Sequence, residues 1–373
     1  MTHPLQAALE RRRKSGNLRE LKVFEGADFC SNDYLGLARF PIKAGALGSG
    51  STGSRLITGH ASALEHLEER LAAFHGFEAA LLFSSGYAAN TGLLSCIAGA
   101  EDAILSDDLI HASLIDGIRL SRAQRQRFVH NDLEDLQAKL DVLSSQISGQ
   151  IYVVVEAVYS MDGDKAPLQD ICALCQNYNA SLIVDEAHSI GIHGDEGRGL
   201  VCELGLEEQV FAAIYTFGKA AGFHGAVITG ASVLRDYLVN FCRPFIYTTA
   251  PSPQTVAETG LAYDRLQGAD PERDALRSVL SYFATHVKNQ ALEGAHWLDS
   301  DSPIQGLVIS GNERAKACAA YLQEHDLAVK AILSPTVAEG AERLRLSLHS
   351  FNTQAEMDGL TTHLSEFLNG GRS

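Results

Sequence analysis

The sequence has no long hydrophobic run. No apolar stretch approaches the roughly 18 residues that a membrane-spanning helix needs. The first twenty residues are polar and rich in arginine, and they lack the apolar centre of a secretory signal peptide. Both absences favour a soluble, cytoplasmic protein with no membrane partner.

Cysteine is sparse and unpaired in pattern. The chain holds seven cysteines, an odd number, and they are scattered rather than regularly spaced. A reducing compartment fits this pattern better than a disulfide framework does. The pair Cys172 and Cys175 has redox spacing, but Ile171, Leu174 and Cys175 share one helical stripe, so packing is the better interpretation.

Positive charge is also in short supply. The chain has 30 basic and 46 acidic residues, which gives a net charge of −16. Such a field disfavours nucleic-acid binding, and it disfavours a polyanionic substrate unless a local basic patch offsets it. The only dense basic cluster is Arg11 to Lys14. It either lies over a substrate entrance or is simply a solvated helix face.

What the chain does have is the size and composition of a large core. With 373 residues, 46% of them hydrophobic, we expect one large domain and a smaller one. The predicted parts are an N-terminal segment over 1–38, a large cofactor domain over 39–255 and a small C-terminal domain over 256–373.

Short apolar runs alternate with helical stretches in the first two thirds of the chain. Because these runs are apolar on both faces, they indicate an α/β fold with a mostly parallel sheet covered by helices. The strand candidates are 79–83, 103–105, 151–156, 181–184, 212–216 and 226–229. The helix candidates are 4–14, one from Ser62 with Ser62 and Glu65 as a capping box and Gly76 as its stop, 253–267, 271–290 and 354–368.

Three motifs suggest functions that their context does not support. Gly48 to Gly53 matches a dinucleotide fingerprint, but no strand precedes it and its helix begins too late. Asp185 to His188 spells a helicase motif, but the segment ending at Lys219 lacks the glycine and hydroxyl of a phosphate loop. Asp185, His188, His193 and Asp195 could be imagined as metal ligands, but they lack a helical histidine pair, so we expect no metal.

A turn and an aspartate indicate a phosphorylated ring. Ser85-Gly86-Tyr87 stands between an apolar strand and a helix expected from about Ala88, where free backbone N–H groups would bind a phosphate. Alone, it is equally an ordinary turn. Asp185 ends an apolar run, and strand ends point into the ligand crevice of open α/β sheets. A carboxylate there pairs with a protonated pyridine nitrogen, unless it only caps the next turn. His188 can sit beside the ring's phenolic oxygen.

Lys219 follows the apolar run 211–215 and has small neighbours, which leave space for a planar ligand. Desolvation would lower its pKa toward the neutral nucleophile that forms a Schiff base. Thr216, three residues earlier, could donate to a phosphate. A lone lysine is usually a surface residue. The order of phosphate turn, Asp185 and Lys219 nevertheless favours a pyridoxal-phosphate (PLP) site with Lys219 as the attachment point.

Eight stretches resemble the α-oxoamine synthases, fold-type I PLP enzymes that join an amino acid to an acyl thioester with loss of carbon dioxide. They occur in the family's order over roughly residues 15–350. The stretches are Ser31-Asn-Asp-Tyr-Leu-Gly36, Gly53-Ser-Arg-Leu-Ile-Thr-Gly59, Ser84-Ser-Gly-Tyr-Ala-Ala-Asn90, His111-Ala-Ser-Leu114, Ser160-Met-Asp-Gly-Asp164, Asp185-Glu-Ala-His188, Thr216-Phe-Gly-Lys219 and Pro335-Thr-Val337 through Arg343-Leu-Arg345. The stretch between Gly36 and Gly50 is short for the family, so we expect the substrate entrance to differ.

The resemblance implies roles for cofactor residues. His111 would stack on the ring, Asp185 would pair with its nitrogen, and His188 would lie near its phenolic oxygen. The phosphate or ring oxygens would be surrounded by the Gly86 and Tyr87 backbone, Ser160 and Thr216. Thr248 would reach the phosphate of a partner subunit, since the family forms homodimers with active sites at the interface.

The resemblance also implies roles for substrate residues. Arg345 and Asn32 would handle the amino acid, Arg345 through its carboxylate. Arg19 and Thr336 would contact the acyl side.

Within the family, the sequence of residues 53–59 and 216–219 is most like that of the biotin-pathway member. We therefore expect L-alanine as one substrate and pimeloyl-CoA or a pimeloyl carrier protein as the other. The guanidinium of Arg19 could hold the far carboxylate of that acyl chain with two hydrogen bonds.

Two alternatives stay open. A sibling enzyme would use glycine with acetyl-CoA, as 2-amino-3-ketobutyrate CoA ligase does, serine with a long acyl chain, as serine palmitoyltransferase does, or the substrates of a signalling α-aminoketone synthase. A noncatalytic binding subunit is a different class of function, and the presence of Lys219 argues against it.

Overall fold

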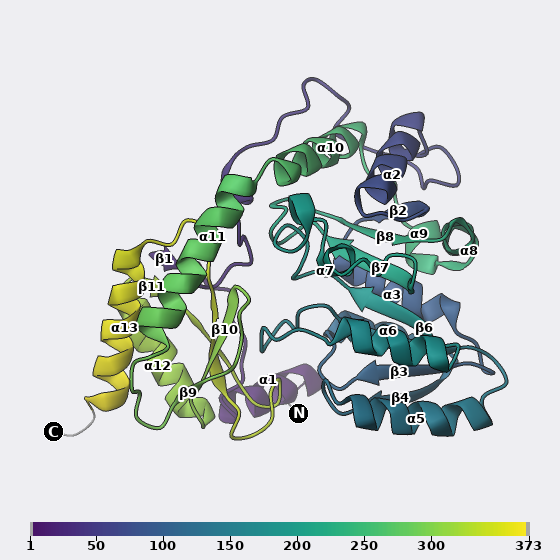
Figure 1. Cartoon of the computed structure of the whole chain (residues 1–373). Helices are drawn as coiled ribbons and strands as arrows, with labels where there is room; N and C mark the ends of the chain where they lie inside the picture. The colour runs from purple at the N-terminus through teal and green to yellow at the C-terminus, as the bar shows by residue number, and fades with distance from the viewer. Residues whose placement is uncertain (1–2, 371–373) are drawn as a thin grey trace. The chain divides into compact units, whose positions relative to one another are not determined.

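The computed structural model describes residues 3–370, which divide into two compact units (Figure 1). The larger unit contains 35–160 and 165–273, and the smaller one contains the chain up to 34, 161–164 and the chain from 274. The predicted divisions lay after 38 and after 255. Helix α10 (Pro253–Gln267) belongs to the larger unit because it packs on α2 (Ser62–Phe74), where Arg70 pairs with Asp264 at 2.5 Å.

A seven-stranded sheet forms the centre of the larger unit. Its strands are β2 (Ala79–Phe83), β3 (Ala103–Asp107), β4 (Gln124–Phe128), β5 (Ile151–Glu156), β6 (Ser181–Asp185), β7 (Val210–Thr216) and β8 (Ala226–Gly230). They lie in the order β2-β8-β7-β6-β5-β3-β4, and only β8 runs against its neighbours. The expected mostly parallel sheet is therefore confirmed.

Helices cover both faces of this sheet, which is why its central strands are apolar on both sides. Every residue of β2, β3 and β5 is buried. One face packs on α3 (Gly86–Ile97), α4 (Ala112–Leu120), α8 (Ser232–Phe241) and α9 (Arg243–Ile246). The other carries α5 (Leu133–Gln146) and α6 (Leu168–Asn177) (Figure 1). The short elements η1 (Leu37–Arg39), η2 (Asp195–Gly197) and α7 (Leu200–Glu203) lie in the connections.

Two local predictions are wrong. Ser62 is the first residue of α2 rather than its cap, Ala61 is the N-cap, and no side chain caps this end. Glu65 instead contacts the ring of His60 at 2.9 Å. Helix α3 begins at Gly86, two residues before the expected start, because Ser85 is its N-cap and accepts from the N–H of Ala88 at 3.2 Å.

The smaller unit is built from two small sheets and helices. Its four-stranded sheet is antiparallel with the order β12-β13-β10-β9, and β1 pairs in parallel with β11. The strands are β1 (Ala27–Asp28), β9 (His296–Trp297), β10 (Ile304–Val308), β11 (Leu327–Ala328), β12 (Lys330–Ile332) and β13 (Arg343–Ser347). The helices are α1 (Pro4–Lys14), the π-helical turn η3 (Phe283–Val287), α12 (Asn312–Glu324) and α13 (Gln354–Asn369), and α11 (Asp270–Tyr282) crosses the division between the units.

Helix α1 buries none of its residues, so the basic cluster from Arg11 to Lys14 faces solvent. Among residues 3–370, no helix combines the length and apolar character needed to cross a bilayer.

Candidate active site

Three polar side chains end neighbouring strands on one face of the large sheet. Glu156 ends β5, Asp185 ends β6 and Thr216 ends β7. Strand residues two apart point to the same face, and Val154, Ile183 and Ile214, two residues earlier in each strand, belong to the core that α3 and α4 cover. The carboxyl ends of these parallel strands therefore present their polar groups toward α3 and α4.

The first turn of α3 has backbone N–H groups that can bind an anion. Its leading N–H groups, at Gly86 and Tyr87, have no partner within the helix, and the helix dipole favours negative charge there. A Cβ on Gly86 would lie 2.4 Å from Cγ2 of Thr216, so only glycine fits. Oγ1 of Thr216 is buried and has no hydrogen-bond partner among the described residues. A bound phosphate would satisfy both groups.

Asp185 is a buried carboxylate held in place from two sides. Oδ1 accepts from the backbone N–H of Ala187 at 2.9 Å, and Oδ2 accepts from Nδ2 of Asn90 at 2.7 Å. Asn90, on α3, also donates to Oγ of Ser113 at 2.9 Å. Asn90 lay in a quoted stretch, but the sequence analysis gave it no role. Its signal was an amide on an otherwise apolar helix face.

His111 is the N-cap of α4, and its ring is fixed by Ser113. Nδ1 accepts from the backbone N–H of Ser113 at 3.2 Å and lies 2.7 Å from its hydroxyl. Burial lowers the pKa of His111, Asp185 acts in the opposite direction, and Lys219 lowers the pKa further. The imidazole is therefore neutral near pH 7, and its electrostatic partners place it in the same site as Asp185 and Lys219.

Lys219 lies in a closed loop after β7. The N–H of Phe217 donates to Gly225 at 2.9 Å, and the N–H of Gly222 donates to the carbonyl of Lys219 at 2.8 Å. Ala220 and Ala221 are buried, whereas Lys219 is half-buried. Small buried neighbours thus hold the lysine backbone while its side chain keeps access to the site.

Glu156, like Asn90, belongs to the site and was missed by the sequence analysis. It is 2% exposed, and in the sheet register it pairs directly with Asp185. Burial and the neighbouring Asp185 raise its pKa well above the usual value, whereas Lys219 and the N–H groups of His111 and Ser160 act to lower it. Its only sequence signal was a charged residue at the end of an apolar strand.

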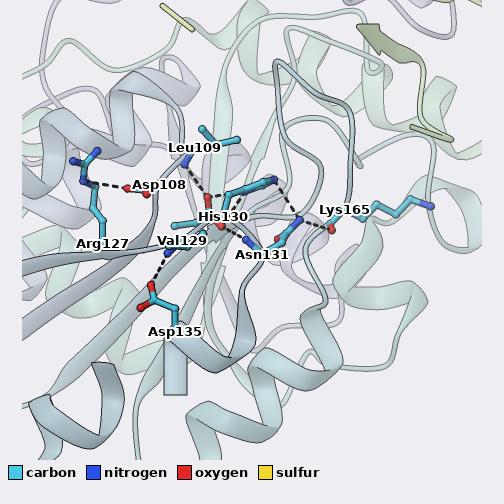
Figure 2. A network of polar contacts seen from close by, with 9 residues as sticks. Asp108, Leu109, Arg127, Val129, His130, Asn131, Asp135 and Lys165 are labelled. Atoms are coloured by element: carbon cyan, nitrogen blue, oxygen red, sulfur yellow. Dashed lines mark hydrogen bonds and ion pairs between the residues drawn. The ribbon is translucent and has the colours of Figure 1, made fainter. Parts of the chain in front are cut away.

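A polar network supports the loop that leads to His111 (Figure 2). Asp107, at the end of β3, is buried and accepts from the N–H of Leu109 at 2.8 Å. It also contacts Nδ1 of His130 at 2.9 Å and accepts from the N–H of Asn131 at 2.9 Å. Asn131 donates to the carbonyl of Lys165 at 3.1 Å. The network ties the β3 loop to the segments after β4 and β5.

The remaining cofactor predictions are His188, Ser160 and Thr248. His188 and Ser160 are buried in the larger unit. Thr248 is exposed and lines a separate cavity of about 250 Å³ together with Ser84 and His224. The structure does not bring Thr248 into the group around Asp185, and its predicted role concerns a partner subunit.

Within the smaller unit, two predicted substrate residues meet. Nη2 of Arg345, on β13, donates to Oδ1 of Asn32 at 3.0 Å, and Tyr34 donates to the same oxygen at 3.1 Å. Nη1 of Arg345 donates to Ser347 at 2.9 Å. Arg345 is 9% exposed, and its guanidinium is held in a fixed orientation by Asn32 and Ser347.

Arg19 and Thr336 are both exposed. Their segments are tied, because Nδ2 of Asn17 donates to the carbonyl of Ser334 at 3.0 Å. Arg19 follows Asn17 by two positions, and Thr336 follows Ser334 by two positions. This hydrogen bond therefore joins the two segments that are predicted to meet the acyl group.

The larger unit suits PLP. The first turn of α3 and Thr216 fit its phosphate, the buried Asp185 fits a protonated pyridine nitrogen, and the neutral His111 fits a ring face. Lys219 supplies the amine that the cofactor's aldehyde needs.

Comparisons with known proteins agree with this arrangement. The family model for aminotransferase class I and II matches residues 25–364. An 8-amino-7-oxononanoate synthase of Marinobacter nauticus is 40% identical, with 96% of this chain and 94% of that protein covered. A solved serine palmitoyltransferase of Sphingomonas wittichii superposes with a TM-score of 0.87 at 29% identity, covering 99% of this chain and 97% of that one.

A second solved serine palmitoyltransferase, from S. paucimobilis, has bound PLP and matches with a TM-score of 0.85 at 28% identity, covering 98% of this chain and 97% of that one. The chain therefore belongs to the aminotransferase class I and II family of PLP enzymes and, within it, resembles the α-oxoamine synthases.

Proposed function

We propose that this protein condenses L-alanine with a pimeloyl thioester to give 8-amino-7-oxononanoate, carbon dioxide and a free thiol. The observation that carries the proposal is the grouping of Asp185, His111 and Lys219 beside an anion site, in a chain 40% identical to an 8-amino-7-oxononanoate synthase. A new C–C bond forms between Cα of alanine and the acyl carbonyl carbon. The C–S bond breaks, and the alanine carboxyl group leaves as carbon dioxide.

PLP, when bound, supplies an electron sink for the negative charge that develops at Cα. Asp185 keeps this sink effective, because an ionised carboxylate favours the protonated pyridine nitrogen. His111 covers a ring face as a neutral group and so adds no positive charge. Lys219 Nζ holds the cofactor at rest and, once released by the amino acid, takes the Cα proton as general base.

The substrate contacts are part of the same proposal. Arg345 holds the alanine carboxylate with a planar fork that Asn32 and Ser347 already orient. Arg19 and Thr336 contact the acyl chain, and the Arg19 guanidinium binds its terminal carboxylate.

The direct experiment is a steady-state assay of thiol release with matched substrate pairs. L-Alanine with pimeloyl-CoA should give the highest kcat/KM, compared with glycine and acetyl-CoA or L-serine and palmitoyl-CoA. The last pair tests a second candidate, because the serine palmitoyltransferases match in structure. A higher kcat/KM for serine with palmitoyl-CoA would overturn the proposal. Pimeloyl carrier protein, assayed in parallel, identifies the thioester donor.

The proposal includes a cytoplasmic homodimer with the larger part as the cofactor domain. The seven cysteines are unpaired, which suits a reducing compartment. Thr248 is exposed, as a residue that serves a partner's phosphate must be before assembly. Sedimentation should give twice the mass of the chain, and a fully active monomer would contradict the dimer.

A further inference from the structure

We propose that His130 is a positioning residue of the cofactor site, which joins the loop that carries His111 to the hairpin that carries Ser160. The proposal rests on the cofactor contacts given under the proposed function, and it is independent of which amino acid and thioester react. His130 acts through these neighbours and not by touching the cofactor.

Asp107 holds His130 on the side of the junction that leads to His111. This carboxylate ends β3, is fully buried, and accepts the N–H of Leu109, two residues before His111, at 2.8 Å. Nδ1 of His130 lies 2.9 Å from Oδ1 and 3.1 Å from Oδ2 of the same carboxylate. Both oxygens already accept a backbone N–H, from Leu109 and from Asn131, so Nδ1 of His130 is the donor in this contact. His130 is therefore tied to the start of the loop that leads to α4.

Tyr159 holds His130 on the other side of the junction. The two rings meet edge to face, with centroids 4.4 Å apart and planes at 89°. Tyr159 is 1% exposed and directly precedes Ser160. An edge-to-face contact between rings prefers a defined geometry in addition to burying area. The ring that is bonded to Asp107 therefore also fixes the residue next to Ser160.

Asn131 reinforces the junction from the next position in the chain (Figure 2). Its backbone N–H donates to Asp107 at 2.9 Å, and its Nδ2 donates to the carbonyl of Lys165 at 3.1 Å. Lys165 forms an antiparallel bridge with Val158, so it lies on the opposite arm of the same hairpin. His130 and Asn131 together hold both arms of the hairpin to the carboxylate that ends β3.

The junction sets the spacing between two groups that the cofactor needs. The proposed contacts place His111 on a face of the PLP ring and Ser160 beside the cofactor's oxygens. The segments that carry them follow β3 and β5, which are adjacent parallel strands and so end at the same edge of the sheet. Without the junction each segment keeps its strand but can shift, and a shift of about 1 Å is enough to misplace a contact.

The test separates the two halves of the junction and measures PLP binding to the full-length apoprotein by absorbance and protein fluorescence. His130→Ala removes both contacts. His130→Asn keeps a donor at the position of Nδ1 but has no ring for Tyr159, whereas His130→Phe keeps a ring but cannot donate to Asp107. The dissociation constant of PLP should rise by about ten-fold or more in His130→Ala and by about three-fold or more in each of the others.

A dissociation constant within about two-fold of the original in His130→Ala would overturn the proposal, since that change equals less than one ordinary hydrogen bond. Should His130→Ala not fold, the same result in both His130→Asn and His130→Phe would overturn it.

A double-variant comparison shows whether His130 acts through His111. When His111 is already alanine, His130→Phe should weaken PLP binding by a smaller factor than it does in the otherwise unmodified protein, because coupled residues are not additive. Equal factors in both backgrounds would indicate a general structural role and overturn the positioning. If His111→Ala alone left PLP binding unchanged, the proposed cofactor contact would fail and the positioning with it. An effect of His111→Ala without one of His130→Ala would overturn the positioning alone.

His363, on α13 of the smaller unit, offers a matched control. Its Nδ1 lies 2.8 Å from a carboxylate oxygen of Glu366, and its ring meets Tyr321 edge to face at 6.1 Å between centroids. Its side chain is 25% exposed, compared with 23% for His130. His363→Phe should therefore leave the dissociation constant of PLP unchanged. A loss of affinity equal to that of His130→Phe would show that the effect does not belong to the junction, and it would overturn the proposal.

Discussion

Asp185 combines a fixed position with a clear chemical purpose, so its removal gives a sharp prediction at the scale of single residues. Asp185→Asn keeps the shape and can still accept from Ala187, but it cannot stabilise a protonated pyridine nitrogen. We expect kcat to fall by several powers of ten while PLP still binds. Exchange of the alanine Cα proton with deuterated solvent, followed by NMR, should fall in parallel, and unimpaired exchange would contradict the pairing.

Lys219→Ala should abolish turnover, because the variant loses both the attachment point and the general base. The absorbance of covalently bound PLP should disappear, while free PLP can still occupy the anion site. Lys139→Ala is a suitable control, since Lys139 is a half-buried lysine of α5 that pairs with Asp135 at 2.6 Å. Near-normal turnover in the Lys219 variant would contradict the assignment of the active site.

Arg19→Lys keeps the charge but loses the planar fork that binds a carboxylate with two hydrogen bonds. We expect a clear rise in KM for pimeloyl-CoA and little change in KM for L-alanine. Steady-state kinetics with each substrate varied in turn would measure both. Unchanged constants would show that Arg19 does not contact substrate, and the case for a dicarboxylic acyl group would weaken.

At the level of single residues, the sequence predicted those site residues that both a motif and the end of a strand indicate. Asp185, Gly86 and Lys219 were predicted because each follows an apolar run at the expected point of an α/β fold. Glu156 also ends an apolar run, but its role depends on lying beside Asp185. That lateral neighbour follows from the strand order and register of the sheet, which no local pattern contains.

Among the elements, the buried strands were predictable and the exposed edge strand β4 was not. The six predicted strands all occur because hydrophobic side chains are needed on both faces of a covered sheet. Strand β4, Gln-Arg-Gln-Arg-Phe, was missed, since it lies at the sheet edge with only Phe128 buried. Its pairing with β3 depends on backbone hydrogen bonds, and its exposed polar residues resemble a loop.

The capping box observed at α13 and the one expected but not found at α2 give a paired prediction. Thr353 and Glu356 form a complete capping box at the start of α13, with bonds of 2.7 Å and 3.2 Å. Thr353→Ala should lower the free energy of unfolding by about 1 kcal/mol. Ser62→Ala should change it by much less, because Ser62 caps nothing. Chemical denaturation of both variants would measure the difference, and equal losses would contradict the observed caps.

For the whole molecule, acid stability should depend on His75. The buried ring stacks on Tyr215 at 3.6 Å between centroids, and burial lowers its pKa to about 3. The unfolded chain binds a proton there below about pH 6.5, whereas the folded chain does not until about pH 3. The free energy of unfolding should therefore fall by up to about 1.4 kcal/mol per pH unit as pH drops through this window.

Denaturant titrations between pH 4.5 and 7 would measure this slope. In His75→Asn, whose side chain does not titrate, the slope should be smaller by up to one proton's contribution. An unchanged slope would show that His75 does not control the acid sensitivity.

The smaller unit draws on both ends of the chain, and this has a consequence for biosynthesis. Strand β1 (Ala27–Asp28) pairs with β11 (Leu327–Ala328), and Asp162 meets Arg343 within the same unit. A ribosome makes the N-terminal segment first, yet its partner strand is translated about 300 residues later. The larger unit can complete its sheet while the segment before residue 35 still lacks its partner strand. A nascent chain released before β11 is made would carry an intact sheet for the cofactor and an N-terminal segment with no strand to join.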